Sequence, residues 1–425
     1  MSWKRDGHDR SRGTKVSVGA TVLCLVLLLT SGVMGRAGIL TWQSDLIFLD
    51  TSFENASPFY WEVDGDGVVH VYLVYDQERA SPNRANGHWF FQVQAKPGAA
   101  LTFVLHNFDN VWNGRKGSPI DQRTVCFTSE DGHAWQTIPT EKTADNLLRF
   151  KVTVDKGLLY LARLEPYRLS DLESFKREIR DNRRVEITTM GKTVEGRDLE
   201  IIRIGNPAAP HRVLLRARAH PWEPGGNWVV QGLVRRLLRD DEDARRYLRT
   251  YCVYVMPMAN KDGVARGRTR FNLHGADLNR KWDKPADPVI NPENHSLETW
   301  LQSMVSKGQK PDLMIDLHND ESGGLHVDRP GQGLDEYLKS MNRLEMVLRQ
   351  HTWFTERCSR AGTSSPGVIG AGLLDRFGVH ACVLELNANW IEGLKAPPSA
   401  QRWQLFGEQL CEAFCHYFEV DAGEK

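Results

Sequence analysis

The chain has 425 residues, of which 41% are hydrophobic and 25% charged, so it is long enough for two or three domains with sizeable cores. Lys and Arg together number 54, as do Asp and Glu, which gives a net charge of zero. This balance lacks the basic surplus with which proteins bind duplex nucleic acid, and the composition excludes large-scale intrinsic disorder.

The first 35 residues combine a basic start with an uncharged, apolar stretch. Five basic residues, the last of them Lys15, precede residues 16–35, which carry no charge and have the apolar centre Val22–Leu29. This pattern predicts a secretory signal peptide over residues 1–35, with the small residues Val33 and Gly35 before the cleavage site. An uncleaved membrane anchor is the alternative, because 20 uncharged residues can just span a bilayer. Both interpretations predict an exported protein, whether periplasmic, secreted or anchored in a membrane.

Residues 39–166 contain short runs of β-branched and aromatic residues that are separated by turn signals such as Asp64-Gly65-Asp66-Gly67. The predicted strands include Val68–Val74, Trp89–Val93, Leu101–His106 and Leu158–Arg163. Short strands between turns favour antiparallel packing, so we predict an all-β sandwich domain over residues 39–166. Pro166 and a polar, helix-like stretch at Leu169–Asn182 mark its end.

From residue 183 the pattern changes to alternating strands and helices. Continuous apolar runs predict buried strands, and apolar stripes predict helices. The strands are Leu199–Ile204, Val213–Ala217, Tyr251–Met256, Leu313–Leu317 and Ala381–Leu386, and the helices are Gly226–Arg239, Leu334–Trp353 and Arg402–Phe418. This alternation predicts an α/β domain over residues 183–420, with a mixed sheet covered on both faces.

The cysteine pattern offers no metal or redox motif. Six cysteines lie beyond residue 35 and none forms a CxxC pair, which argues against a zinc ribbon or a thioredoxin-like site. Export would permit disulfides, but Cys252 and Cys382 lie in predicted buried strands, so we expect both to be buried free thiols.

Residues that suit a metal ion follow two of the predicted strands. His220 and Glu223 come directly after Val213–Ala217, at the strand end where α/β sheets place their sites, and zinc accepts both imidazole nitrogen and carboxylate oxygen. The HxxE pattern is short and common, so by itself it is a hypothesis. His318 closes the strand Leu313–Leu317, with Asn319-Asp320 expected to turn away, and it is either a third ligand or a hydrogen-bonded structural residue.

Two further groups could act on a substrate. Asn279 and Arg280 follow a loop that contains Arg266, Arg268 and Arg270; they suit the binding of a carboxylate, or they belong to a solvated basic loop. Glu385 lies among apolar residues in the strand Ala381–Leu386. The residues alone favour a structural salt bridge for it over a general base.

Taken together, these segments resemble the zinc carboxypeptidase family, and most of all the branch of the cytosolic carboxypeptidases, which includes the tubulin deglutamylases, and its bacterial relatives. The similar segments occur in the family's order. They are Ala217–Glu223, Pro257–Val264, Phe271–Trp282, Ile315–His318 and Leu384–Leu386, and a β-rich half resembling the sandwich that precedes the catalytic domain in this branch comes before them. The resemblance covers about residues 42–418.

The resemblance implies a role for each of these positions. His220, Glu223 and His318 would bind one Zn²⁺ per chain, and Asp277 would hold a zinc-binding imidazole in place. Glu385 would be the general base, Arg270 would stabilise the developing oxyanion, with Arg266 and Arg268 as alternatives, and Asn279 and Arg280 would bind the terminal carboxylate of the substrate.

One departure from the family pattern concerns the substrate. Many members carry a Tyr before the catalytic strand, where it covers the bound substrate, but residues 354–384 contain no Tyr, and Gly362–Gly367 occupies that region. The segment Ala361–Leu374 also has no charged residue, so it supports neither acidic nor basic specificity.

The resemblance thus implies an exported zinc metallocarboxypeptidase that acts on the C-terminus of a peptide or protein, with no nucleic-acid partner and with membrane contact only through an N-terminal anchor. Two alternatives stay open. The first is a zinc amidohydrolase acting on cell-wall peptides or acylated amino acids. The second is a binding protein with a degenerate site, although the presence of all three ligands and the base speaks against it.

Overall fold

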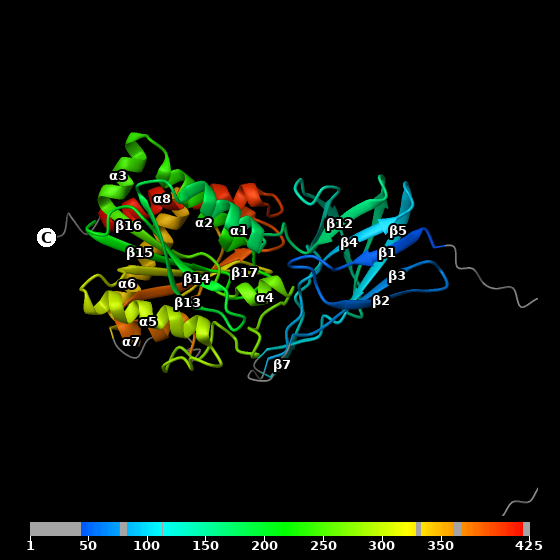
Figure 1. Ribbon diagram of the computed structural model, residues 1–425, viewed down its shortest axis with the longest axis horizontal. Helices are drawn as coiled ribbons and strands as arrows, with labels where there is room; N and C mark the ends of the chain where they lie inside the picture. The colour runs from blue at the N-terminus through cyan, green and yellow to red at the C-terminus, as the bar shows by residue number, and fades with distance from the viewer. Residues whose placement is uncertain (1–43, 77–82, 113, 329–332, 360–366, 420–425) are drawn as a thin grey trace, which may run out of the picture. The chain divides into compact units, whose positions relative to one another are not determined.

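The computed structural model describes residues 44–76, 83–112, 114–328, 333–359 and 367–419 (Figure 1). The predicted signal peptide or anchor at residues 1–35 and most of Gly362–Gly367 therefore lie outside the described residues. Among the helices of the described part, none is both long and apolar enough to cross a bilayer.

The N-terminal half forms two five-stranded sheets that enclose an apolar core. One sheet has the order β1 (Leu46–Asp50), β4 (Phe90–Ala95), β12 (Leu158–Ala162), β8 (Val125–Ser129), β9 (Gln136–Pro139). The other has the order β10 (Glu141–Lys142), β11 (Leu148–Val154), β5 (Ala99–His106), β3 (Val69–Leu73), β2 (Phe59–Val63). Strand β11 alternates buried and exposed residues strictly, as expected of a strand with one face on a core. The predicted antiparallel sandwich is confirmed, except that β3 and β5 pair in parallel.

A small hairpin extends from this half. Its strands β6 (Asn110–Trp112) and β7 (Arg115–Gly117) pair with each other in antiparallel orientation. Further along the chain, α1 (Leu169–Ile179) packs its residues Phe175 and Ile179 against the core of the C-terminal half.

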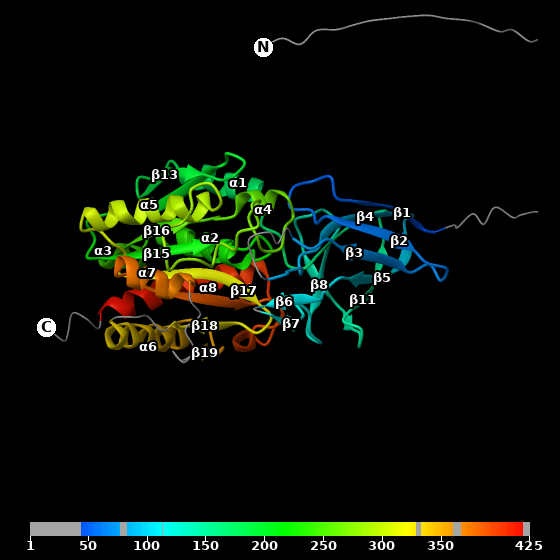
Figure 2. The same ribbon diagram turned by 90° about the horizontal axis from the view of Figure 1, so that it is seen from below.

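The C-terminal half is built on an eight-stranded mixed sheet, drawn mostly in green to orange in Figure 2. Its order is β13 (Val185–Lys192), β14 (Asp198–Ile204), β16 (Tyr251–Met256), β15 (His211–Ala217), β17 (Leu313–Asp320), β20 (His380–Asn387), β18 (Gly324–His326), β19 (Cys358–Ser359). The central strands β16, β15, β17 and β20 are parallel, so their carboxyl ends meet at one edge.

Helices cover both faces of this sheet, as predicted. Val213 and Leu215 of β15 face a core shared with α2 (Gly225–Leu238), α6 (Leu334–His351) and α8 (Ala400–Glu419). Leu214 faces the opposite core, which is shared with α5 (Pro292–Ser306) and α7 (Ile369–Phe377). The short helices α3 (Glu242–Thr250) and α4 (Lys261–Ala265) flank strand β16.

The predicted strands and helices all occur, and Tyr251–Met256 matches residue for residue. The end of Leu313–Leu317 was predicted wrongly: β17 continues through Asn319 to Asp320, because both residues still pair with β20. Cys252 and Cys382 are buried free thiols, as expected. The division of the chain into domains at residues 166–183 stays a prediction, because the residues from Ser44 onward form one unit.

Specific hydrogen bonds join the two halves. Arg163, at the end of β12, donates to the backbone oxygen of Ala388 at 3.2 Å. Asn55 donates to the backbone oxygen of Val264, in α4, at 3.1 Å. Both bonds are buried, so the sandwich holds α4 and the segment that follows β20 in place.

Candidate metal centre

His220 and Glu223 lie in the turn between β15 and α2. Arg218 takes a left-handed backbone conformation (φ 62°) directly after β15 and turns the chain sharply away from the sheet. The guanidinium of Arg218 holds the turn, because its Nε donates to the backbone oxygen of Pro221 at 2.7 Å. A left-handed non-glycine residue is strained, and such strain is typical of functional turns.

His318 belongs to the neighbouring parallel strand β17, and its side chain is fully buried. The next residue, Asn319, ties the strand to the turn, since its Oδ1 accepts from the backbone N–H of Gly225 at 2.9 Å. A Cβ at Gly225 would lie 2.7 Å from that oxygen, so the start of α2 needs glycine to approach the strand this closely.

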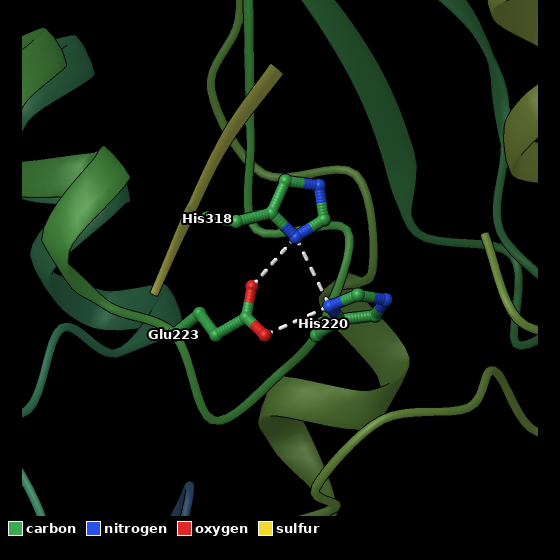
Figure 3. Close-up of side chains that lie close together, drawn as sticks. All are labelled: His220, Glu223 and His318. Atoms are coloured by element: carbon green, nitrogen blue, oxygen red, sulfur yellow. Dashed lines mark hydrogen bonds and ion pairs between the residues drawn. The ribbon is translucent and has the colours of Figure 1, made fainter. Parts of the chain in front are cut away.

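The three predicted ligands converge (Figure 3). His220 Nδ1 lies 2.8 Å from Glu223 Oε1, and His318 Nδ1 lies 2.8 Å from Glu223 Oε2. The two Nδ1 atoms are 3.0 Å apart. Two imidazole nitrogens and one carboxylate thus face a common point, with one ligand atom of each residue within 4.8 Å of the others.

The other nitrogen of each imidazole is held by a buried aspartate. His220 Nε2 lies 3.2 Å from Asp277 Oδ1, and His318 Nε2 lies 2.8 Å from Asp316 Oδ2. Such bonds keep the proton on Nε2 and turn the Nδ1 lone pair toward the common point. Asp316 is itself paired with the buried Arg216 at 3.3 Å.

This arrangement suits a cation. Two Nδ1 lone pairs 3.0 Å apart and a carboxylate would repel one another unless a proton or a metal ion lay between them. Burial would raise the pKa of Glu223, but its close contacts with His220 and His318, which favour a charged carboxylate, outweigh burial and lower that pKa. A donor set of two imidazoles and one carboxylate is a known three-ligand set of catalytic zinc sites.

The described residues contain two other groups with metal-binding side chains. The first, His351, Glu412 and His416, joins α6 to α8, but its carboxylate already accepts from Arg246 and Tyr247. The second consists of Asp320, His326 and Glu385, which line the same cleft as the buried site. Neither provides aspartates that orient its imidazoles, so the His220–Glu223–His318 site is the best formed.

Glu385 lies beside His318, because the two residues are paired in the parallel strands β17 and β20. Its Oε2 atom is buried and has no hydrogen-bond partner among the described residues. Nor does any described Lys or Arg form an ion pair with it, so the structural salt bridge that the residues alone favoured is not observed. Burial raises the pKa of Glu385 well above its usual value, and the charges of Asp320 and Glu223 add to this effect.

Arg270 and Arg280 both line the cleft and lie near each other beside the ring of Trp112. Arg270 Nε donates to Asp277 Oδ2 at 2.9 Å, and its guanidinium stacks over the ring of Trp112 at 3.8 Å from the ring centroid. The guanidinium of Arg280 lies 5.2 Å from the same ring. The charge of Arg270 and the hydrogen bond from His220 outweigh burial and hold the pKa of Asp277 well below its usual value.

The other predicted cleft residues are placed as follows. Asn279 is buried, and its Oδ1 accepts from the backbone N–H of Ile369, at the start of α7. Arg266 is exposed and pairs with Glu195 at 2.7 Å. Neither Arg266 nor Arg268 lines the cleft, so Arg270 is the arginine of this loop that faces the site.

The sandwich holds the Arg270 loop through Asp76, whose side chain is 5% exposed. The Asp76 carboxylate accepts hydrogen bonds from three successive backbone N–H groups, those of Thr269, Arg270 and Phe271, at 2.5 to 3.1 Å. Burial raises the pKa of Asp76, and the three N–H donors act against that rise.

The site opens into a cleft of about 500 Å³ that both halves of the chain line. The mixed-sheet half contributes Trp222, Glu223, Thr269, Arg270, Asn279, Arg280, Asn319, Asp320, Glu321, His326, Asp328, Val368, Val383 and Glu385. The N-terminal half contributes Ala85, Asn86, Gly87, Asn110, Trp112, Gly117, Ser118 and Pro119. A candidate metal site, a buried carboxylate and two arginines thus share one cavity.

Asp316, Asp76 and Trp112 belong to this site but were not predicted from the sequence. Asp316 had a local signal, because residues two apart in a strand share a face and Asp316 therefore lies beside His318. Asp76 and Trp112 had no such local signal, because both contact Arg270, which lies more than 150 positions further along the chain. Only the packing of the two halves brings these residues together.

Residues 172–322 match the family model described as zinc carboxypeptidase. A relative from Zymomonas mobilis, named only as an uncharacterized protein, is 28% identical over 304 residues, which are 70% of this chain and 73% of that protein. Cytosolic carboxypeptidase 2 of Xenopus tropicalis is 32% identical over 155 residues. That match spans 33% of this chain but only 16% of the frog protein.

Solved structures share the fold over nearly the whole described chain. The metallo-carboxypeptidase from Burkholderia cenocepacia superposes with a TM-score of 0.77 at 18% identity, covering 88% of this chain and 99% of its own. A metallo-carboxypeptidase from Pseudomonas aeruginosa superposes with a TM-score of 0.72 at 22% identity, covering 87% of this chain and 98% of its own. The arrangement of a sandwich before a mixed sheet thus occurs in other proteins.

Proposed function

The chain belongs to the zinc carboxypeptidase family, and so to the metallocarboxypeptidase hydrolases, and from this premise we propose that it is a zinc-dependent exopeptidase that removes C-terminal residues from peptides or proteins. One observation carries the proposal. The His220–Glu223–His318 site shares its cleft with Arg280 and with Glu385, whose Oε2 has no hydrogen-bond partner among the described residues. The cleft thus combines a metal site, a base and a cation for the substrate's terminal carboxylate.

The proposed roles follow from position. Zinc, when bound by His220, Glu223 and His318, supplies Lewis acidity toward the scissile carbonyl and the attacking water. Glu385 accepts a proton from that water and returns it to the leaving amine, a task that suits a carboxylate whose pKa burial has raised.

The arginines and Asn279 orient the substrate. Arg270 donates to the carbonyl oxygen as negative charge develops on it, while Asp277 keeps the guanidinium in place. Arg280 and Asn279 bind the terminal carboxylate, which places the last peptide bond beside Glu385.

A peptide-digestion experiment tests this function. The zinc-loaded protein is incubated with an unmodified peptide of ten residues, and the products are followed by mass spectrometry. We expect successive losses of single residues from the C-terminus and none from the N-terminus. Internal cleavage would contradict the exopeptidase proposal. Hydrolysis of cell-wall peptides or acylated amino acids alone would favour the amidohydrolase, and zinc binding without turnover on any substrate would favour a binding protein.

Removal of one ligand should release the metal. We expect one zinc ion per wild-type chain and less than about a tenth of that in His318→Ala, because two remaining ligands hold zinc poorly. Elemental analysis after gel filtration measures the ratio. His274→Ala is the matched control, because His274 is exposed, and it should keep its zinc. Stoichiometric zinc in His318→Ala would contradict the ligand assignment.

Asp76 should support catalysis from the sandwich side. We expect Asp76→Ala to lower kcat/KM at least about tenfold, because three buried N–H groups lose their acceptor, at about 1–3 kcal/mol for each unsatisfied group, and the loop that carries Arg270 loosens. The zinc content should not change, since no ligand is touched. Asp66→Ala, at an exposed turn of the sandwich, is the control. An unchanged kcat/KM in a folded Asp76→Ala protein would show that the contact is only structural.

We also propose that the protein is exported, on the pattern of residues 1–35. Relatives in the comparisons are named cytosolic carboxypeptidases, so the compartment has to be measured directly. Cell fractionation with N-terminal sequencing of the protein should find it outside the cytoplasm, beginning after Gly35 if the signal is cleaved. A protein that stays in the cytoplasm would contradict the proposal.

A further inference from the structure

One wall of the cleft would receive the side chain of the substrate's last residue. Glu385 and Val383 are two residues apart in β20, so both point to the same face of the sheet, and both line the cleft. Val368, just before α7, and Asp328, just after β18, line it as well. With the terminal carboxylate at Asn279 and Arg280, the side chain beside it enters this part of the cavity.

Asp328 is the charged group of this wall. Its side chain is only 9% exposed, and its Oδ2 atom is buried without a hydrogen-bond partner among the described residues. The carboxylate packs against Gly370, where an added Cβ would come within 2.1 Å of Oδ2. Burial raises the pKa of Asp328 to about 6, although a hydrogen bond from the backbone of Ala371 and the charge of Arg280 oppose this rise.

More acidic residues than arginines line the cleft. Its acidic residues are Glu223, Asp320, Glu321, Asp328 and Glu385, whereas its described cations are Arg270 and Arg280. Glu223 and Glu385 serve the metal and the reaction, and both arginines are committed to the carbonyl and the terminal carboxylate. The other three acids, Asp320, Glu321 and Asp328, form no ion pair with either arginine among the described residues, although the charge of Arg280 is felt at Asp328. Asp328 has the smallest exposed fraction of the three.

We propose that Asp328 forms the floor of a pocket for a positively charged C-terminal side chain, so that the enzyme releases Lys or Arg in preference to other residues. The proposal rests on the carboxypeptidase function proposed above. The methylene stem of Lys or Arg packs along Val383 and Val368, and its cationic head meets the unpartnered oxygen of Asp328. The segment Ala361–Leu374 has no charged residue and therefore indicated no substrate preference in the sequence. In this proposal the charge that selects the substrate comes instead from Asp328, which precedes that segment in the chain.

A structural role is the competing explanation. The carboxylate lies at the start of α7, where a hydrogen bond from the backbone of Ala371 stabilises it without any substrate. Under that explanation, the loss of the charge would weaken the fold and would affect all substrates alike.

The test compares peptides that differ only in their last residue. Zinc-loaded enzyme is assayed on four peptides ending in Lys, Arg, Leu and Glu, and kcat/KM is measured for each. We expect values for Lys and Arg at least about tenfold above the value for Leu, with Glu the slowest. In Asp328→Asn the ratio of Lys to Leu should fall at least about tenfold, while the value for Leu changes less than about threefold.

Each outcome decides a different question. If no peptide loses its last residue, the proposed function fails. If Leu or Glu is released fastest by the wild type, the pocket proposal fails while the function stands, and this comparison holds even where Asp328→Asn does not fold. If Asp328→Asn slows all four peptides equally, the aspartate is structural. Asp320→Asn, another acid of the cleft, is the matched control and should keep the preference for Lys.

Discussion

Glu385→Gln should lower kcat at least about 100-fold, because general-base catalysis contributes about 10²–10⁴-fold to such reactions. The amide has nearly the same shape as the carboxylate but cannot accept the proton of the attacking water. Since Glu385 is not one of the three proposed ligands, the zinc content should stay at one per chain. The fold should also survive, because Glu385 makes no ion pair with any residue in the described part of the chain that the substitution would break.

Steady-state kinetics on one good peptide, with elemental analysis and a thermal melt of the same sample, measure these three quantities. Glu178→Gln is the matched control, since Glu178 pairs with Arg235 at the surface and lies outside the cleft. A Glu385→Gln enzyme with wild-type kcat would show that another group activates the water.

The convergence of the three candidate metal ligands could be predicted because their signals are local. His220, Glu223 and His318 each follow or end a strongly apolar strand, and parallel strands bring their carboxyl ends to one edge of a sheet. The structure pairs Glu385 with His318 in the neighbouring parallel strand, a placement that the sequence analysis did not predict, and its role as a base came only from the resemblance to the family. The residues alone favoured a salt bridge, and only the structure shows that Glu385 Oε2 has no partner among the described residues.

Other parts of the site depend on contacts between residues far apart in the sequence, which the hydrophobic pattern of strands and helices does not predict. Trp112 reaches Arg270 from the sandwich, and Asp76 holds the same loop from a position 194 residues away. In the sequence, nothing distinguishes Asp328 from other polar residues that follow a strand. Only the structure shows that it lines the same cleft as Val383 and Glu385, which is the basis for the specificity proposed for it. The end of β17 was predicted wrongly for a related reason. The side chain of Asn319 forms hydrogen bonds with the backbone of α2 and of β20, so this polar residue continues the strand and does not begin a turn.

Arg280→Ala should lower kcat/KM on free peptides about 10- to 150-fold. A zinc ion, a water and a base hydrolyse an internal amide as readily as a terminal one, so a group that recognises the free carboxylate must restrict cleavage to the chain end. Arg280 lines the cleft beside the buried Asn279 and has no carboxylate within salt-bridge distance among the described residues. Its Nη1 donates to the backbone oxygen of Asn279 at 2.7 Å, and the N–H groups outside that bond can face a ligand. A charged hydrogen bond contributes about 1.5–3 kcal/mol, which sets the expected range.

The amidated form of the same peptide provides the decisive comparison. Amidation removes the negative charge that Arg280 would bind, so the wild type should cleave the amidated peptide as slowly as Arg280→Ala cleaves the free one. The variant, in turn, should barely distinguish the two peptides, because the group that senses the difference is gone. Arg177→Ala, on the exposed face of α1, should retain full discrimination. If the wild type cleaves both peptides equally well, Arg280 does not bind the terminal carboxylate, and the restriction to the chain end loses its physical basis.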